Sequence, residues 1–205
     1  MILSPAFGLV NSEHGQYNHQ SMKRNTESGA KAAMRPADIA YTALGTALIS
    51  VCAWITVPFT VPFTMQLFAV FLSLILLGGR NGMIAVAAYL LLGAIGVPVF
   101  SGFRGGLGVL IGMTGGYLWG MLLICAAYWI GTRCFGRNWI VEAASLAAGL
   151  LLCYLTGTIW FSVLNAESGF VASLAVCVVP FLLPDAAKLV FAVLLGRKLR
   201  SVLHL

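Results

Sequence analysis

The chain of 205 residues is 60% hydrophobic and only 9% charged, and its formal net charge is +6. Soluble domains contain roughly 25% charged residues, so an ordinary soluble fold is excluded. The mean hydropathy of +0.95 and the continuous apolar runs indicate a helical membrane protein, because β-barrel strands alternate apolar and polar residues. The basic residues gather at chain ends and in short loops, as membrane topology requires, so they do not indicate nucleic-acid binding.

Residues 1–36 differ from the rest of the chain because they are polar and show no apolar periodicity. They lack the basic start followed by an uninterrupted apolar core that defines a secretory signal. We therefore expect a disordered cytoplasmic N-terminal tail over residues 1–36. Residues 37–205 are expected to form one membrane domain that binds a substrate.

Six apolar segments follow the tail, and a helix needs about 20 residues to cross the hydrocarbon core. Negative charge at the start of the last segment and positive charge at its end both suit a helix dipole. A further apolar stretch, Phe170–Val179, precedes Pro180 and is expected to be a short helix at the outer face. The predicted spans are Ala37–Val57, Thr64–Leu77, Gly82–Ile95, Gly115–Ile130, Trp139–Leu164 and Asp185–Leu203.

The loop charges predict the orientation of these spans. With both termini in the cytoplasm, Arg80, Arg133 and Arg137 lie on the cytoplasmic side, as the positive-inside rule requires. Arg104 is the exception, because it falls in the outer loop between the third and fourth spans. The predicted fold is an all-α integral membrane protein with six transmembrane helices and a glycine-rich outer loop between helices 3 and 4.

That loop holds an unusual concentration of glycine. Thirteen of the 23 glycines fall between Gly78 and Gly120, most densely over Gly102–Tyr117. Glycine costs a helix about 1 kcal/mol relative to alanine, so this segment turns rather than spans. Backbone without helical hydrogen bonds is tolerated in a membrane only when it is buried in protein or lines a wet cavity. We expect the loop to fold back over the outer half of the bundle; a flexible outer connection is the alternative.

The fourth span begins with a pattern that suits an anion. Thr114 is a favourable N-cap, and Gly115, Gly116 and Tyr117 follow it. The free N–H groups of a helix N-terminus inside a membrane attract a negatively charged group, and two glycines allow close approach. Ordinary capping without a ligand is the alternative.

Asp185 and Lys188 lie three residues apart at the start of the last predicted span and share a helix face. Ionisable residues inside a membrane are costly and usually face an interior or a cavity. One alternative is an ion pair that satisfies only itself. In the other, the carboxylate accepts N–H groups while the ammonium pairs with an acid. Together with Arg104 and the start of the fourth span, this pair suits a small ligand with N–H donors at one end and an acid at the other.

Three more polar residues are candidates for the same site. Gln66 opens the second span, and its amide both donates and accepts hydrogen bonds. Tyr89 lies within the third span and Tyr117 at the start of the fourth, although each tyrosine alone is a weak indication because tyrosines often form membrane belts. Glu142, near the inner start of the fifth span, suits that helix dipole and needs no further role.

Other features argue against enzymes and metal proteins. The five cysteines form no metal-binding spacing, and the three histidines lie near the chain ends, so a metal centre or a His-dependent hydrolase lacks its residues. Ala43 and Ala47 form a small-xxx-small pattern, which allows close helix approach, within the chain or with a partner.

Together these residues resemble the BioY family, the biotin-binding S components of energy-coupling factor (ECF) vitamin transporters. The resemblance covers residues from about Ala37 onward. Met113 stands where the family commonly has proline, and Leu183-Pro184-Asp185 stands where it commonly has Pro-Gly-Asp. The matching stretches are Val61-Pro62-Phe63-Thr64-Met65-Gln66, Tyr89 to Phe100, Gly102 to Tyr117, and Pro180-Phe181-Leu182-Leu183-Pro184-Asp185.

The resemblance implies a six-helix protein of the cell membrane that captures biotin from outside at high affinity and delivers it inward. It implies partners as well, namely a membrane T component and two ATPase subunits, with Ala43 and Ala47 facing the T component. Biotin would be the transported ligand and no cofactor is expected. The alternatives are an S component for another small vitamin and, in a different class, a structural membrane protein without transport activity.

Overall fold

A computed structural model of the chain describes residues 35–57, 62–165 and 169–203. The chain divides into two units, Met1–Ile39 and Ala40–Leu205. Apart from Arg35 and Pro36, the predicted tail lies outside the described residues. Within the first unit, Nε of Arg35 lies 3.1 Å from a carboxylate oxygen of Asp38.

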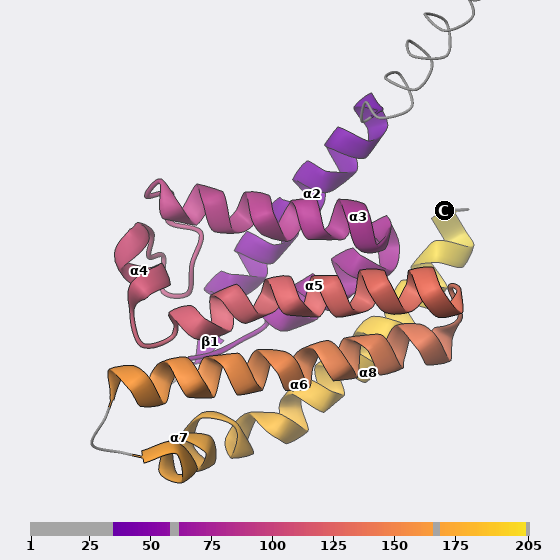
Figure 1. Cartoon of the computed structure of the whole chain (residues 1–205). Helices are drawn as coiled ribbons and strands as arrows, with labels where there is room; N and C mark the ends of the chain where they lie inside the picture. The colour runs from indigo at the N-terminus through magenta and orange to yellow at the C-terminus, as the bar shows by residue number, and fades with distance from the viewer. Residues whose placement is uncertain (1–34, 58–61, 166–168, 204–205) are drawn as a thin grey trace, which may run out of the picture. The chain divides into compact units, whose positions relative to one another are not determined.

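Helices make up nearly all of the described chain (Figure 1). Two short strands, β1 (Thr56–Val57) and β2 (Phe63–Thr64), pair antiparallel. Two helices are short, α4 (Leu107–Ile111) and α7 (Gly169–Cys177). The long helices are α2 (Pro36–Trp54), α3 (Gln66–Ala94), α5 (Gly115–Phe135), α6 (Trp139–Leu164) and α8 (Val179–Leu203).

Five helical stretches of the described residues are long and apolar enough to cross a membrane. This confirms the prediction of an all-helical, multi-pass membrane protein. The first helix ends at Trp54 rather than at the predicted Val57, because Thr56 and Val57 pair with Thr64 and Phe63 in the two strands.

The second and third predicted spans correspond to α3, which breaks at Gly78. Thr64 belongs to β2 instead, and Met65 and Ile95 flank the helix. Gly78 has φ +81° and ψ 169°, a conformation that favours glycine. In a straight helix residues 74 and 82 would lie about 12 Å apart along the axis. Here a Cβ placed on Gly82 would lie 3.0 Å from Cα of Leu74, so the two parts of α3 fold back on one another. The predicted separation at Gly78-Gly79 is therefore observed.

The last helix begins earlier than predicted. It starts at Val179 rather than at Asp185, and the N–H groups of Phe181 and Leu182 donate to the carbonyl of Val178 at 2.9 and 3.0 Å. Pro184 lies inside the helix, where its missing N–H removes one bond near the N-terminal end. Asp185 therefore lies in the second turn of α8 and is not the residue that begins the helix. The short helix predicted over Phe170–Val179 is α7.

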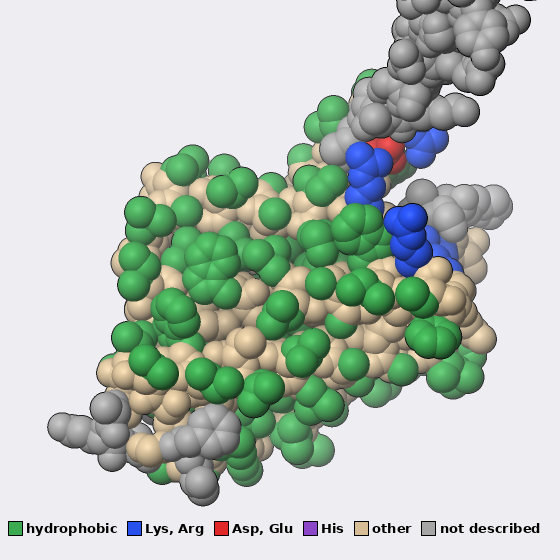
Figure 2. Space-filling model, viewed as in Figure 1, with side chains coloured by type: hydrophobic (Ala, Val, Ile, Leu, Met, Phe, Trp, Pro, Cys, Tyr) green, Lys and Arg blue, Asp and Glu red, His purple; other side chains and the backbone are tan. Residues whose placement is uncertain are grey.

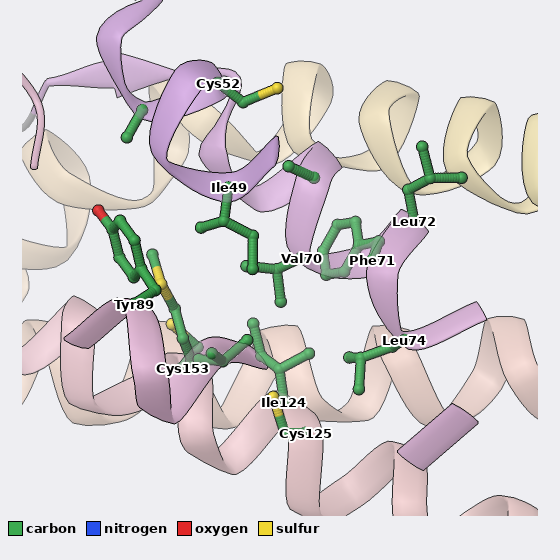
Figure 3. Packing of buried hydrophobic residues seen from close by; sticks show 14 of the residues in the cluster. Ile49, Cys52, Val70, Phe71, Leu72, Leu74, Tyr89, Ile124, Cys125 and Cys153 are labelled. Atoms are coloured by element: carbon green, nitrogen blue, oxygen red, sulfur yellow. The ribbon is translucent and has the colours of Figure 1, made fainter. Parts of the chain in front are cut away.

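Close helix packing explains many of the remaining glycines. On the α5–α6 pair, a Cβ on Gly149 would lie 2.7 Å from Cα of Ile124, and one on Gly120 would lie 3.0 Å from Cα of Cys153. Small residues let two helix backbones approach in this way. Figure 3 shows the apolar core beside this pair, with side chains of α2, α3 and α5 meeting between the ribbons.

Candidate functional site

A cavity lies among β2, the start of α3, the loop before α4, and helices α5, α6 and α8. Its walls are mostly apolar, with a few polar side chains that enter it from different elements. It is lined by Pro62, Thr64, Gln66, Leu67, Phe100, Ser101, Arg104, Val109, Thr114, Tyr117, Leu118, Met121, Cys153, Tyr154, Cys177, Phe181, Asp185 and Lys188. Small-ligand sites commonly have this composition.

Asp185 and Lys188 form a buried ion pair on the α8 wall. They lie on one face of α8, three residues apart, and Nζ of Lys188 lies 2.7 Å from Oδ1 of Asp185. Asp185 is 2% exposed and Lys188 is 7% exposed. The hydroxyl of Tyr154, from α6, donates to the other carboxylate oxygen, Oδ2, at 2.7 Å. Each oxygen of Asp185 thus has one donor, which fixes the carboxylate plane and leaves a further lone pair on each oxygen.

Lys188 has other partners too. Its ammonium group also donates to the carbonyl of Thr64 at 2.7 Å and lies 3.8 Å from the centre of the Phe63 ring. An ammonium group has three donors, and two of them have protein acceptors here. Lys188 therefore connects α8 to β2, and its main role in this structure is to hold Asp185 and the strand.

Arg104 reaches the cavity from the glycine-rich loop. Its Nε donates to the carbonyl of Ser101 at 3.2 Å, while its own carbonyl accepts from the N–H of Phe100 at 2.9 Å. These bonds form a tight turn in which Gly102 and Phe103 have positive φ values of 70° and 56°. Arg104 is exposed, and within the described residues its terminal guanidinium nitrogens have no acceptor, so they remain available for an acid.

The same loop is packed tightly against its neighbours. The indole N–H of Trp54 donates to the carbonyl of Pro98 at 2.9 Å, and its ring stacks on Phe103 with centroids 4.9 Å apart. A Cβ on Gly105 would lie 2.4 Å from the carbonyl oxygen of Val97, so only glycine fits there. These contacts favour a loop that folds back onto the bundle over the alternative of a flexible outer connection.

Gln66 and Tyr117 contribute polar groups to the inner part of the cavity. Gln66 is 4% exposed, and its side-chain amide donates to the sulfur of Met121 at 3.2 Å. A thioether is a weak acceptor, so this amide would gain from a stronger partner. The hydroxyl of Tyr117 lies 3.3 Å from that of Thr158.

The start of α5 differs from the prediction. Thr114 lines the cavity, but its side chain makes no capping hydrogen bond. The N–H groups of Gly115 and Tyr117 are also occupied, since they donate to the carbonyls of Gly112 and Thr114 at 2.9 and 3.1 Å. The predicted row of free N–H groups is therefore wrong for these two residues, because the preceding turn supplies their acceptors.

Gly115 and Gly116 do not line the cavity. A Cβ on Gly115 would lie 2.0 Å from the carbonyl oxygen of Leu110, and one on Gly116 would lie 2.3 Å from Cβ of Trp160. These glycines therefore allow close packing of α5 against α4 and α6, rather than close approach of a ligand.

Tyr89 is also outside the cavity. It is fully buried, and its ring packs edge-on against Phe100 with centroids 5.4 Å apart. Phe100, rather than Tyr89, lines the cavity. Among the described residues the Tyr89 hydroxyl has no hydrogen-bond partner. The six predicted residues that the structure brings together are Gln66, Arg104, Thr114, Tyr117, Asp185 and Lys188.

Sequence reasoning missed Tyr154, which bonds directly to Asp185. Tyr154 lies inside a long apolar run, and no feature of the sequence distinguishes it there from a tyrosine that only packs. Sequence reasoning also underestimated the role of Glu142. This residue is 1% exposed and accepts hydrogen bonds from Tyr128, Arg137 and Arg200 at 2.9, 3.2 and 2.9 Å. Glu142 is the centre of a polar cluster rather than only a dipole partner. Within the described residues, no group of His, Cys, Asp and Glu could hold a metal ion.

Ala43 and Ala47 occupy one exposed face of α2, whereas Gly45 and Thr46 between them are buried. A Cβ on Gly45 would lie 2.9 Å from the side chain of Leu77, and Thr46 donates to the carbonyl of Ala85 at 3.1 Å. The buried face of α2 therefore packs within the bundle, and the two alanines face away from it.

An apolar, membrane-crossing helical bundle with a buried acidic–basic pair and a loop arginine in one cavity defines a membrane protein that binds a small polar solute. Comparison with protein families matches residues 22–204 to the BioY family. The chain belongs to the BioY family, a family of transporters rather than enzymes, which confirms the resemblance seen in the sequence.

Named relatives and a solved structure agree with this assignment. The biotin transporter BioY of Thermotoga maritima is 44% identical over 162 residues, covering 77% of this chain and 92% of the relative. The probable biotin transporter BioY of Pyrococcus horikoshii is 37% identical and covers 82% and 99%. A 2.1 Å crystal structure of the S-component for biotin from an ECF-type ABC transporter matches with a TM-score of 0.75 at 27% identity. That match covers 82% of this chain and 95% of the other.

Proposed function

We propose that this protein captures biotin in the cavity described above and delivers it across the cell membrane. The observation that supports this best is the Asp185 carboxylate, fixed by Tyr154 and Lys188 on one wall of the cavity that Arg104 also lines. A carboxylate accepts the ureido N–H groups of biotin, and a guanidinium group pairs with the biotin acid through two parallel hydrogen bonds.

The apolar lining between these groups suits the rest of the ligand. Leu67, Leu118 and Phe181 offer aliphatic and aromatic surface, and the biotin ring and chain would bury apolar area against them. Gln66 would exchange its weak sulfur acceptor for a polar atom of the ligand. Tyr117 and Thr114 complete the polar wall in this proposal. Tyr89, Gly115 and Gly116 would not contact the ligand and would instead pack against the elements that form the cavity.

Transport requires further partners in this proposal. The solved S-component from an ECF-type ABC transporter supports an ECF assembly, in which this chain would pair with a membrane T component and two ATPase subunits would supply the energy. We place both termini in the cytoplasm of a cell-membrane protein, from the distribution of basic residues. The exposed alanines Ala43 and Ala47 would then allow a helix of the T component to approach α2 closely.

The proposal is tested by equilibrium binding of labelled biotin to the purified protein, with Asp185→Asn as the site variant. Wild type should bind biotin and release it to excess unlabelled biotin, and the variant should bind at least tenfold more weakly. Equal binding by a folded Asp185→Asn protein would remove this residue from the site. Absence of biotin binding by the wild type would overturn the proposed function itself.

A further inference from the structure

The end of the bundle remote from Arg104 contains a concentration of cations that the transport site does not use. Figure 2 shows Lys and Arg side chains gathered at the end where α5 is followed by α6, while apolar side chains cover much of the remaining face. Three segments meet there: the break of α3, the α5–α6 connection and the end of α8. Their cations are Arg80, Arg133, Arg137, Arg197, Lys198 and Arg200, which we call the basic end.

Contacts join the three segments directly. Arg137 and Arg200 both donate to Glu142 and to the carbonyl of Ile75, just before the break at Gly78. A helix break leaves carbonyl groups without helical hydrogen-bond donors. Here the guanidinium groups of Arg137 and Arg200 donate to one such carbonyl, that of Ile75. Arg197 adds a second connection, with its guanidinium carbon 5.4 Å from the centre of the Trp139 ring.

Among the described residues from Ala40 onward, acidic side chains do not balance the charges of the basic end. Glu142 is shared by Arg137 and Arg200, and the other described acidic residue from Ala40 onward, Asp185, is bonded in the cavity. Arg80, Arg133, Arg197 and Lys198 therefore have no acidic partner among the described residues from Ala40 onward, and all four are exposed. Four exposed cations packed into one end of a membrane protein require anions from their surroundings.

Apolar side chains lie directly beside these cations. Phe135, Trp139 and Ile140 are 79%, 50% and 56% exposed. Phe135 ends α5 and Trp139 and Ile140 begin α6, so they lie close in sequence to Arg133 and Arg137. A bound group at this place would meet guanidinium forks on one side and exposed apolar surface on the other. A phospholipid has both parts, a phosphate for the guanidinium groups and acyl chains for the apolar side chains.

We propose that the basic end is a binding site for an anionic glycerophospholipid, with Arg133, Arg197 and Lys198 contacting the headgroup and Trp139 and Ile140 contacting the acyl chains. Arg137 and Arg200 hold the three segments together through Glu142. The site depends only on the protein lying in a membrane, so it stands or falls independently of the identity of the transported ligand.

The test measures binding of fluorescent phosphatidylglycerol and phosphatidylcholine to the detergent-solubilised full chain. The anionic lipid should bind at least tenfold more tightly. Neutralising one cation should weaken binding of the anionic lipid about fivefold. The triple variant Arg133→Gln, Arg197→Gln, Lys198→Gln should therefore lose the preference for this lipid. The control is Arg104→Gln, which removes a charge at the cavity loop and should keep the preference. The unfolding temperature of each variant confirms that it is folded.

Several results would overturn the proposal. These are equal binding of the two lipids by wild type, or an unchanged preference in the folded triple variant. Displacement of the lipid by millimolar inorganic phosphate would indicate a site for a free anion instead. If soluble polyglutamate displaces the fluorescent lipid as effectively as unlabelled lipid does, the basic end binds an acidic protein partner instead.

Discussion

Tyr154 donates its hydroxyl proton to Oδ2 of Asp185 over 2.7 Å, from a helix 31 residues earlier in the chain. Lys188 holds the other oxygen of the same carboxylate. Two donors from different helices therefore fix the acceptor group before a ligand arrives. Such preorganisation reduces the free-energy cost of ordering the site on binding. The roles proposed for Tyr154, Asp185 and Arg104 can be separated by single substitutions.

Tyr154→Phe should weaken biotin binding by about tenfold, because a hydrogen bond to a charged group contributes about 1.5 to 3 kcal/mol. The carboxylate remains but loses one of the two donors that orient it. The matched control is Tyr128→Phe, which removes an equivalent hydrogen bond, from Tyr128 to Glu142 at 2.9 Å. The control should keep its affinity in the same binding titration. Equal losses in the two variants would show a general packing effect instead of a role at Asp185.

Asp185→Asn and Glu142→Gln form a second matched pair. Each substitution removes a buried carboxylate that accepts from a tyrosine and from basic side chains. Both should lower the unfolding temperature, because each leaves cations without their partner. Only Asp185→Asn should also weaken biotin binding, by about ten- to a hundredfold. If the Glu142→Gln protein loses biotin binding at temperatures where the protein is folded, Glu142 is not limited to a role in stability.

Arg104→Ala should speed the release of biotin more than the release of biotin amide, which lacks the acid. The guanidinium group is held by the loop through Ser101, and its free nitrogens would pair with the carboxylate. We expect the biotin dissociation rate to rise by about tenfold or more, and Arg133→Ala should leave it unchanged. If the dissociation rates of biotin and biotin amide rise by the same factor in the Arg104 variant, Arg104 supports the loop and does not recognise the acid.

Ala43→Leu combined with Ala47→Leu should preserve biotin binding but lower biotin uptake by cells that contain the ATPase module. Both alanines are exposed, and larger side chains there would separate α2 from a partner helix. Gly45→Leu is the contrasting variant, because its side chain would meet Leu77 inside the bundle. That variant should lower the unfolding temperature. Loss of biotin binding in the double-alanine variant would place Ala43 and Ala47 in internal packing.

The sequence predicted the helical membrane class well, because apolar run length and loop charge depend on local composition alone. It also predicted the break at Gly78, where two glycines interrupt an apolar run. The start of α8 was predicted incorrectly because Pro184 looked like a boundary, whereas the helix loses only one hydrogen bond there. Propensity cannot show that earlier residues already supply a stable first turn.

The site was predictable where its residues are unusual for a membrane. Asp185, Lys188 and Arg104 stand out as charges, and Gln66 as an amide, in apolar surroundings. Tyr154 did not stand out, because its role depends on the distance between α6 and α8. Gly115 and Gly116 were assigned to ligand approach, although close contacts with Leu110 and Trp160 explain them. Such contacts between distant segments follow from helix packing, which the sequence pattern does not contain.

The most direct test of biotin capture is a thermal unfolding measurement on the detergent-solubilised protein with a panel of vitamins. A ligand that binds only the folded state adds about 2.7 kcal/mol at a hundredfold excess over its dissociation constant. Biotin should therefore raise the unfolding temperature, and thiamine, riboflavin and folate should leave it unchanged. A rise with one of these three vitamins and none with biotin would contradict the assignment.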